Sequence, residues 1–423
     1  MQKLSREYTA TPYAWIILVV LFTGLLATFG MRSSFGAYIS PWEQDFSVGR
    51  TLITSVSMLS FVVFAIGQPL AGKLNDRLGK SIVPSVSVIL VGTSLFLTSR
   101  ATQMWQVFFT YGIGFSCGIS GCCNSVSASI LTNWFVEKRG FALGLATSGM
   151  AVGSFILVPA NLFIIERLGW RTSMAALGII IVAVVGPLYM FLLRSKPEEK
   201  GMKPYGYKES KTAGRSGAAG KPKPEKDLPI LSVFKTKAFR RLSAAYFVCG
   251  FTDVGLIQTH LIPIAQHKNF PVTGVAMAFS LIAIANIVGT IVTGHMSDHF
   301  DRTKQLSVIY AFRAVTFIFL ITMQSPVLLW VFAVAYGAVE MASIAPTNSL
   351  AVELLDGYST GTLLGIVFVS HQIGGAVGSW APGLLYDITG SYYAVLALSV
   401  IMLFGASLLV LKIPDSKNKQ RLA

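Results

Sequence analysis

Six residues with charged or titratable side chains interrupt stretches of the chain that are otherwise apolar, and these residues could bind a charged solute or carry a proton. They are Arg32, Asp253, His260, Arg313, Glu340 and His371. A guanidinium stays protonated and its donors match a carboxylate, whereas Asp, Glu and His can exchange a proton. A charged side chain in the middle of a bilayer costs about 2.5–3.5 kcal/mol on insertion scales, so each of these positions indicates a functional site by default.

The elements that must hold these residues are about twelve apolar stretches, each of about 18 to 27 residues and able to cross a hydrocarbon core of about 30 Å as an α-helix. Of the 423 residues, 53% are hydrophobic and 13% are charged, and the charges gather between the stretches. We therefore expect an all-α polytopic membrane protein. The expected spans are 13–38, 51–72, 81–99, 104–132, 140–163, 171–194, 240–264, 273–296, 305–323, 326–352, 361–383 and 391–412.

A polar segment rich in Lys, Gly, Pro and Ser divides the chain. We expect an N-terminal six-helix bundle at 1–194, a cytoplasmic linker at 195–239 that acts as a solvated tether, and a C-terminal bundle with a short cytoplasmic tail at 240–423. Most of the 34 Lys and Arg residues fall on the side of both termini, which the positive-inside rule places in the cytoplasm. Anionic lipid then explains the net charge of +15, so we expect a bilayer partner and no nucleic acid.

Metal and cofactor chemistry is not indicated by the sequence. The four cysteines, Cys117, Cys122, Cys123 and Cys249, fall inside predicted spans without metal-ligand spacing, and we interpret them as small packing residues. The sequence also has no nucleotide-binding loop of the Walker type and no nucleophile motif. We expect no cofactor, no metal, no ATP and no enzymatic activity.

A motif between two apolar stretches occurs twice. The segment Gly72-Lys73-Leu74-Asn75-Asp76-Arg77-Leu78-Gly79-Lys80 has a weaker copy in Gly294-His295-Met296-Ser297-Asp298-His299-Phe300-Asp301-Arg302. Glycine permits close helix packing, and an acid with a base beside it can hold a helix end. This pattern predicts a conformational latch, formed by Gly72, Asp76, Arg77, Gly79, Lys80, Gly294, Asp298 and Arg302.

The doubled motif, the six-plus-six layout and the long central linker resemble the major facilitator superfamily over almost the whole chain. Other stretches are similar to the monocarboxylate transporter family and its bacterial relatives, including oxalate:formate antiporters. These are Asn133-Trp134-Phe135-Val136-Glu137-Lys138-Arg139-Gly140, Ala142-Leu143-Gly144-Leu145-Ala146, Gly169-Trp170-Arg171, Leu385-Tyr386-Asp387 and Thr389-Gly390-Ser391-Tyr392. The resemblance implies two homologous halves that alternately expose a site near the middle of the membrane, lined by the first and seventh helices.

Several roles follow from the positions of these residues together with the resemblance. The distance between the two motif copies carries Arg32 to position 254, next to Asp253, so the two residues occupy nearly equivalent places. A Lys stands at the place of Arg32 in human-type monocarboxylate transporters, and we expect Arg32 to bind the anion, with a structural pair to Asp253 as the alternative. His260, seven residues after Asp253, would share its helical face as a proton relay or gate, or would anchor the helix end. His371 could bind a carboxylate or pass a proton, or could bond to a neighbouring helix.

The eighth span departs from the family pattern. The family commonly has an Asp there and an Arg four residues later, whereas this chain has Asn286 and Thr290. Glu340 would be protonated or paired with Arg313. The candidate substrate-binding residues are Arg32, Asn286, Arg313 and His371, and the candidate proton-coupling residues are Asp253, Glu340 and His260.

The sequence thus predicts a secondary transporter, a monomer in the cell membrane, that moves a small organic anion such as a monocarboxylate with a proton by alternating access. Two alternatives share this fold, namely proton-coupled efflux of a hydrophobic or cationic compound and exchange of a dicarboxylate for a monocarboxylate. A membrane sensor or scaffold that does not transport is a third possibility from another class.

Overall fold

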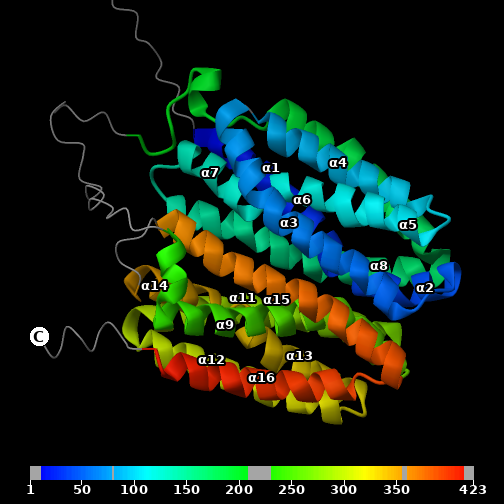
Figure 1. Cartoon of the computed structure of the whole chain (residues 1–423). Helices are drawn as coiled ribbons and strands as arrows, with labels where there is room; N and C mark the ends of the chain where they lie inside the picture. Colours follow the sequence, from blue (N-terminus) through cyan, green and yellow to red (C-terminus); the bar gives the residue numbers. More distant parts are fainter. Residues whose placement is uncertain (1–10, 79–80, 208–229, 355–359, 414–423) are drawn as a thin grey trace, which may run out of the picture. The chain divides into compact units, whose positions relative to one another are not determined.

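The computed structural model describes residues 11–78, 81–207, 230–354 and 360–413, and in these ranges it is almost entirely helical (Figure 1). The α-helices are α1 (Thr11–Ser33), α2 (Gly36–Phe46), α3 (Arg50–Leu78), α4 (Ile82–Ser99), α5 (Met104–Val107), α6 (Ser116–Gly121), α7 (Asn124–Trp134), α8 (Arg139–Ile180), α9 (Lys237–Gly250), α10 (Gln258–His267), α11 (Val272–His299), α12 (Arg302–Thr322), α13 (Pro326–Glu340), α14 (Ile344–Leu354), α15 (Thr360–Thr389) and α16 (Tyr393–Leu411). The predicted all-α class is confirmed.

Ten helical segments in the described ranges are long and apolar enough to cross a membrane. The difference from the predicted number has two causes. The predicted spans 140–163 and 171–194 form one helical run, Arg139–Leu192, which bends at Gly169 (φ 80°, ψ 162°), a left-handed conformation that glycine adopts readily. The predicted span 104–132 is divided into short helical pieces. A twelve-helix membrane fold accommodates both features.

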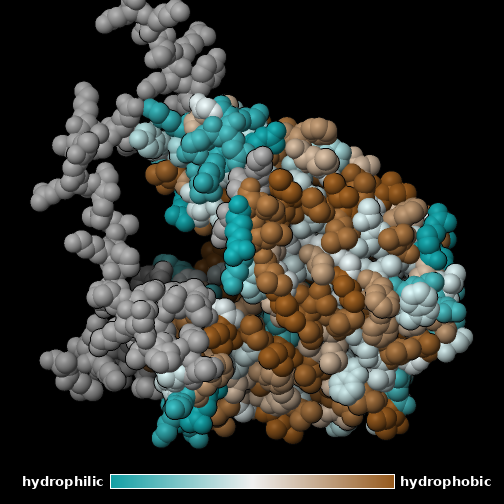
Figure 2. Space-filling model, turned by 45° about the horizontal axis from the view of Figure 1, so that its top comes forward, coloured by the Kyte–Doolittle hydropathy of each residue, from teal (hydrophilic) through white to brown (hydrophobic). Residues whose placement is uncertain are grey.

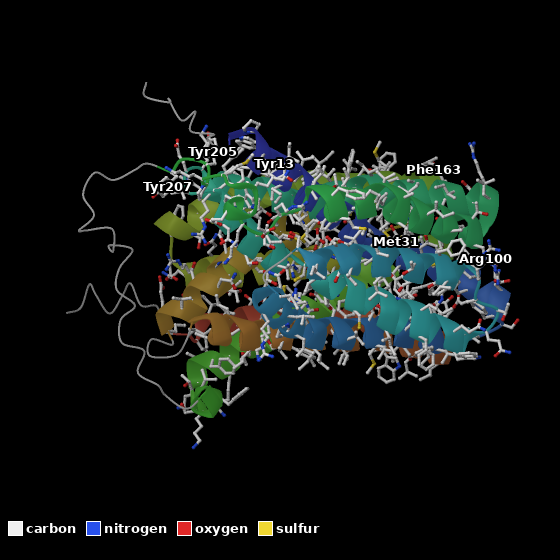
Figure 3. The ribbon with its side chains drawn as sticks, turned by 90° about the horizontal axis from the view of Figure 1, so that it is seen from above. Tyr13, Met31, Arg100, Phe163, Tyr205 and Tyr207 are labelled. Carbon is white, nitrogen blue, oxygen red and sulfur yellow. The ribbon has the colours of Figure 1, made fainter. Side chains whose placement is uncertain are left out.

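Apolar side chains cover the outer surface of these helices, as a lipid environment requires. Ile66, Ile291 and Ile401 are 60%, 69% and 69% exposed. Figure 2 shows many apolar residues on the surface that faces the viewer. In Figure 3, Tyr13 and Tyr205 lie near one end of the helices and Arg100 lies near the opposite end.

Regular α-helical geometry breaks within several of the membrane-crossing segments. Residues Phe108–Phe115 and Phe251–Ile257 form π-helices, the second of which joins α9 to α10. The tenth predicted span is broken between α13, which ends at Glu340, and α14, which begins at Ile344. Such interruptions free backbone groups and often mark functional sites in membrane proteins. Asp253 and Glu340 lie at two of these breaks.

The described residues divide into two compact units that do not follow the predicted halves. The first unit comprises parts of Met1–Arg32, Val63–Gly153 and Leu168–Lys221, and the second comprises parts of Ser33–Val62, Ser154–Arg167 and Pro222–Ala423. Segments from before the linker therefore belong to the same unit as the C-terminal helices. The division into bundles at 1–194 and 240–423 stays a prediction.

Close contact between α15 and the α9–α10 segment organises the second unit. A Cβ added at Gly250 would collide with the backbone of His371, and one added at Gly374 would collide with that of Phe247. One added at Gly378 would collide with Phe251. Glycines at such positions let helix backbones approach closely. This packing brings His371 next to the segment that contains Asp253.

Candidate functional site

Glu340 is the last residue of α13 and is 6% exposed. Its carboxylate accepts a hydrogen bond of 2.7 Å from Asn286 Nδ2 of α11 and one of 3.4 Å from Gln258 Nε2 of α10. The Thr290 hydroxyl in turn donates to Asn286 Oδ1 at 3.3 Å. The two residues at which the chain departs from the monocarboxylate family pattern thus form a polar chain that ends on Glu340.

Asp253 lies in the π-helical segment and is 5% exposed. Its Oδ1 atom accepts a hydrogen bond of 3.0 Å from the hydroxyl of Tyr336, which precedes Glu340 by one turn of α13. Asp253 also interacts electrostatically with Glu340 and Arg313. The two acids and Arg313 therefore belong to one buried group.

Of the two alternatives for Glu340, a proton or a pair with Arg313, the side-chain ion pair is not formed among the residues that the structure describes. Arg313 is fully buried and donates from NH2 to the main-chain oxygens of Val339 and Glu340, at 2.7 and 2.5 Å, and from NH1 to Cys249 Sγ at 3.1 Å. The oxygens are free for this because α13 ends at Glu340, leaving its last carbonyls without helical donors. Arg313 thus caps the broken helix.

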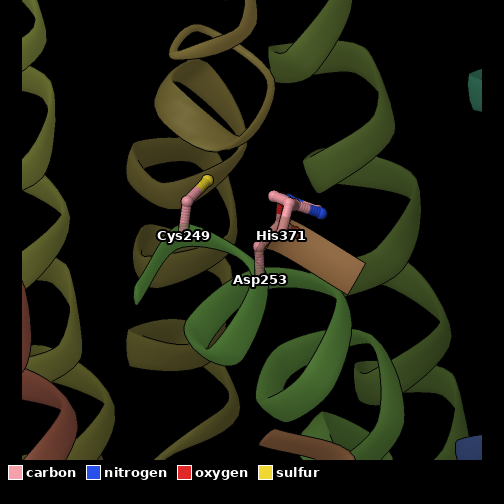
Figure 4. Close-up of side chains that lie close together, drawn as sticks. All are labelled: Cys249, Asp253 and His371. Atoms are coloured by element: carbon pink, nitrogen blue, oxygen red, sulfur yellow. The ribbon is translucent and has the colours of Figure 1, made fainter. Parts of the chain in front are cut away.

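Cys249 was not among the predicted site residues, yet it lies at the centre of this group. Its sulfur receives the Arg313 hydrogen bond and lies 3.3 Å from the Ser343 hydroxyl. Ligand atoms of Cys249, Asp253 and His371 lie within 4.8 Å of one another (Figure 4). The spacing of four residues between Cys249 and Asp253 was the available signal, and its interpretation as simple packing missed the partner on α15.

His371 lies on α15 at 9% exposure, with its ring centroid 4.6 Å from that of Tyr246 and 6.1 Å from that of Phe368. It joins the group around Asp253. The structure therefore brings together Asp253, Asn286, Arg313, Glu340 and His371 among the predicted candidates.

His260 belongs to a separate group. Its Nε2 lies 2.7 Å from the main-chain oxygen of Ser379, and its Nδ1 lies 3.1 Å from the Tyr392 hydroxyl. Because a carbonyl only accepts, Nε2 carries the proton and Nδ1 accepts from Tyr392. His260 and Asp253 have different partners, and a π-helix, which has more residues per turn than an α-helix, covers most of the segment between them. The role of His260 as a proton relay, gate or helix anchor stays a prediction.

Arg50 completes this second group, although the sequence placed it in a loop between spans. It is 7% exposed, donates to Tyr392 Oη at 3.0 Å and to Glu43 Oε1 at 2.6 Å, and stacks 3.7 Å from the Tyr386 ring centroid. Asp387 accepts hydrogen bonds of 3.0 and 2.8 Å from the main-chain N–H groups of Arg50 and Thr51. This carboxylate thereby caps the N-terminus of α3. The Leu385–Asp387 motif was the available signal for this group.

Arg32 lies one residue before the end of α1, in the first compact unit. Its guanidinium lies 4.4 Å from the centroid of the Phe64 ring, a cation–π distance. The relation of Arg32 to Asp253, which belongs to the second unit, stays a prediction.

The predicted latch is described only in part. Gly79 and Lys80 lie outside the described residues, as do the side chains of Asp76 and Asp298. The expected close packing through glycine is wrong for the part of the chain that the structure describes, because a Cβ at Gly72 or Gly294 would meet none of its atoms within 4 Å.

The remaining latch residues differ between the copies. Arg77 is exposed at the end of α3. Arg302 pairs with Glu353 of α14 and donates to Ser297 O at 3.2 Å, while Asp301 caps α12 through the N–H groups of Thr303 and Lys304. The second copy therefore joins α11, α12 and α14, and its role as a latch stays a prediction.

The beginning of the linker is not the free tether that we expected. The Tyr205 N–H donates to Trp134 O at 2.7 Å, and Tyr205 O accepts from the Val136 N–H at 3.0 Å. The Tyr205 ring lies 6.0 Å from the ring of Trp15. The segment up to Tyr207 is thus attached to the first unit, and the Gly- and Lys-rich part at 214–224 lies outside the described residues.

Membrane-crossing helices that break around buried charged residues define a multi-pass membrane transport protein. The chain belongs to the Major Facilitator Superfamily, whose sequence model matches residues 20–379 and 242–423. It is similar to the uncharacterized MFS-type transporter YcxA of Bacillus subtilis, with 25% identity over 96% of each chain. It is also similar to monocarboxylate transporter 13 of Rattus norvegicus, with 23% identity over 95% of this chain and 89% of the relative.

A solved structure shares the fold. A bacterial homologue of the human lysosomal transporter Spinster, in an inward-facing and occupied conformation, superposes with a TM-score of 0.74 at 16% identity, covering 95% of this chain and 96% of the other. The family and these relatives are transporters, so the protein is a transporter of small molecules and not an enzyme. The predicted family is confirmed.

Proposed function

We propose that this protein is a proton-coupled secondary transporter that moves a small organic monocarboxylate across the cell membrane by alternating access. The observation that carries the proposal is the setting of Glu340. This carboxylate is buried at a helix break, its donors are the neutral amides of Asn286 and Gln258, and no cationic side chain of the described residues forms an ion pair with it.

One proton shared between the two buried acids would balance the charges of the site, and we place this proton on Glu340. Arg313 provides one fixed positive charge and interacts electrostatically with Asp253. If Asp253 balances Arg313, a proton on Glu340 leaves the buried group neutral, which is the least costly state in a medium of low dielectric. Loss of the proton from Glu340 would place a negative charge at the break between α13 and α14 and change the energy of this arrangement. Proton-coupled transport requires such a link between protonation and conformation.

Arg32 supports an anionic substrate. It keeps a permanent positive charge within a predicted span, at the place where the monocarboxylate family has Lys. Asn286 and Thr290 do not take over the binding of a substrate carboxylate at this place in the second unit. Asn286 donates its hydrogen bond to Glu340, and Thr290 donates to Asn286. The anion would therefore bind through Arg32. Movement of a monoanion with one proton transfers no net charge and would follow the pH gradient rather than the voltage.

Uptake into liposomes tests this proposal. Purified protein is reconstituted, and a panel of mono- and dicarboxylates is offered with and without an imposed pH gradient, at zero and at non-zero membrane potential. We expect the pH gradient to drive accumulation of a monocarboxylate inside the liposomes. The rate of this uptake should not depend on the membrane potential. A flux that depends on the membrane potential would contradict electroneutral transport. Moving one net elementary charge across the membrane changes the free energy by about 2.3 kcal/mol per 100 mV. Strict one-for-one exchange with a dicarboxylate would indicate an antiporter.

One observation favours a second candidate, proton-driven efflux of a cationic compound. The buried group of the second unit contains two carboxylates, Asp253 and Glu340, against the single guanidinium of Arg313, whose donors are directed to Cys249 and the main chain. An excess of acid suits a cation. Preference for lipophilic cations over carboxylates in the same liposomes would establish this candidate and reject the first.

A further inference from the structure

We propose that Cys249, Asp253 and His371 form a binding site for a thiophilic divalent cation, for which Zn²⁺ is the best fit. The three residues come from two elements, the α9–π-helix segment and α15, and lie close together in Figure 4. One thiol, one carboxylate and one imidazole offer the sulfur, oxygen and nitrogen ligands that Zn²⁺ binds. Among the described residues this is the group whose ligand atoms could hold a metal ion.

Backbone packing, rather than chance orientation, brings the third ligand to the other two. Cys249 and Asp253 lie four residues apart along one segment, so they project from neighbouring turns. His371 reaches them because α15 approaches at Gly250, where any side chain would collide with the His371 backbone. Gly250, which lies between Cys249 and Asp253, thus permits the contact with α15.

The distances fit an ion after small side-chain movements. The three ligand atoms lie within 4.8 Å of one another. In a tetrahedral Zn²⁺ site, bonds of about 2.3 Å to sulfur and about 2.1 Å to nitrogen place these ligand atoms about 3.6 Å apart. An approach of about 1 Å closes the site, and rotation of the side chains can supply it.

The surrounding groups would support the bound ion. Ligands of metal sites are commonly fixed by hydrogen bonds from a second layer of residues. Here Tyr336 donates to Asp253 Oδ1, which leaves Oδ2 for a metal, and Arg313 and Ser343 approach the Cys249 sulfur. The thiolate is the form of cysteine that binds metals. Loss of the thiol proton to solvent gives a thiolate that, together with the Asp253 carboxylate, balances the two charges of Zn²⁺.

An ion at this position would join α15 to the α9–α10 segment. Because the site is buried, the ion needs access along the transport path, and in this respect the inference rests on the proposed function. The consequence is that Zn²⁺ should hold the second unit in one arrangement and inhibit transport. The binding itself can be measured without any transport.

The test is Zn²⁺ binding to the purified full-length protein in detergent, by competition with a chromophoric chelator. We expect one tightly bound ion per chain. Changing a residue that merely supports a metal ligand lowers affinity by about 10- to 100-fold, so loss of a ligand in Cys249→Ser or His371→Gln should lower it at least as much. Cys117→Ser and His267→Gln remove a thiol and an imidazole outside the site and should bind as the unmodified protein does.

The absorption spectrum of bound Co²⁺ distinguishes a metal ligand from a residue that only stabilises the fold. With Co²⁺ in place of Zn²⁺, the unmodified protein and Cys117→Ser should show a thiolate-to-metal charge-transfer band, and Cys249→Ser should lack it. The inference is overturned if the unmodified protein binds no ion, or if Cys249→Ser and His371→Gln bind as tightly as the controls. Transport in liposomes without added Zn²⁺ would stand or fall independently of these results.

Discussion

Asn286 Nδ2 donates a hydrogen bond of 2.7 Å to Glu340 Oε2, so a side chain of α11 holds the carboxylate at the break between α13 and α14. A carboxylate bound by a neutral amide can gain or lose a proton without breaking an ion pair. Asn286 and Thr290 stand in the eighth predicted span, where the monocarboxylate pattern has an acid and a base. The polar residues of this span are directed to an acid on another helix.

Arg313 should stabilise the fold. Its loss in Arg313→Met leaves the main-chain oxygens of Val339 and Glu340 buried without their donor, at about 1–3 kcal/mol each. We expect a fall of several degrees in the melting temperature of the detergent-solubilised protein. Arg100→Met, which changes an exposed arginine at the end of α4, should leave the melting temperature nearly unchanged. Equal melting temperatures of the two variants would contradict the capping role of Arg313.

Tyr392→Phe should loosen the first turn of α3. The Tyr392 hydroxyl accepts from Arg50 and donates to His260, and loss of a hydrogen bond costs about 0.5–1.5 kcal/mol. Hydrogen–deuterium exchange of residues 50–54 should therefore rise severalfold, while that of α4 stays constant. Tyr393→Phe removes the neighbouring hydroxyl, from a residue that is 66% exposed, and serves as the control. Matching exchange rates in both variants would show that Tyr392 does not link Arg50 to His260.

Gly250→Ala should destabilise the contact between α9 and α15. The added Cβ would collide with the backbone of His371, and overpacking of this kind costs about 1–3 kcal/mol. At Gly405 in α16 an added Cβ would meet no atom of the described residues within 4 Å. Because alanine forms helices better than glycine, Gly405→Ala should leave the stability unchanged or raise it by up to about 1 kcal/mol. Thermal unfolding of the two variants measures both effects. A Gly250→Ala protein as stable as Gly405→Ala would mean that the helices do not depend on this close approach.

The sequence predicted the membrane-crossing helices because hydropathy and length are local properties. It could not predict the π-helix at Phe251–Ile257 or the end of α13 at Glu340, since these depend on contacts with other helices. The acceptors of Arg313 could not be predicted for the same reason: the carbonyls that it binds become available only where α13 stops. Charge alone suggested the pair, whereas the observed acceptors are main-chain atoms.

Position along the chain also concealed residues of the two buried groups. Arg50 looked like a loop charge, because nothing near it in the sequence shows that Tyr386, Asp387 and Tyr392 surround it. Cys249 looked like a packing residue, because its neighbours Arg313 and His371 are far away in the sequence. By contrast, the mid-span acids Asp253 and Glu340 were predictable, since an ionisable residue in an apolar span is conspicuous by itself.

The central claim, that Glu340 carries the coupled proton, is tested most directly by Glu340→Gln in liposomes. The amide keeps the shape of the side chain but cannot exchange a proton. Substrate accumulation driven by a pH gradient should be lost, while exchange of labelled for unlabelled substrate across the membrane should continue. Glu166→Gln, at an exposed glutamate of α8, should retain both activities. Accumulation by Glu340→Gln at the rate of the unmodified protein would contradict the account.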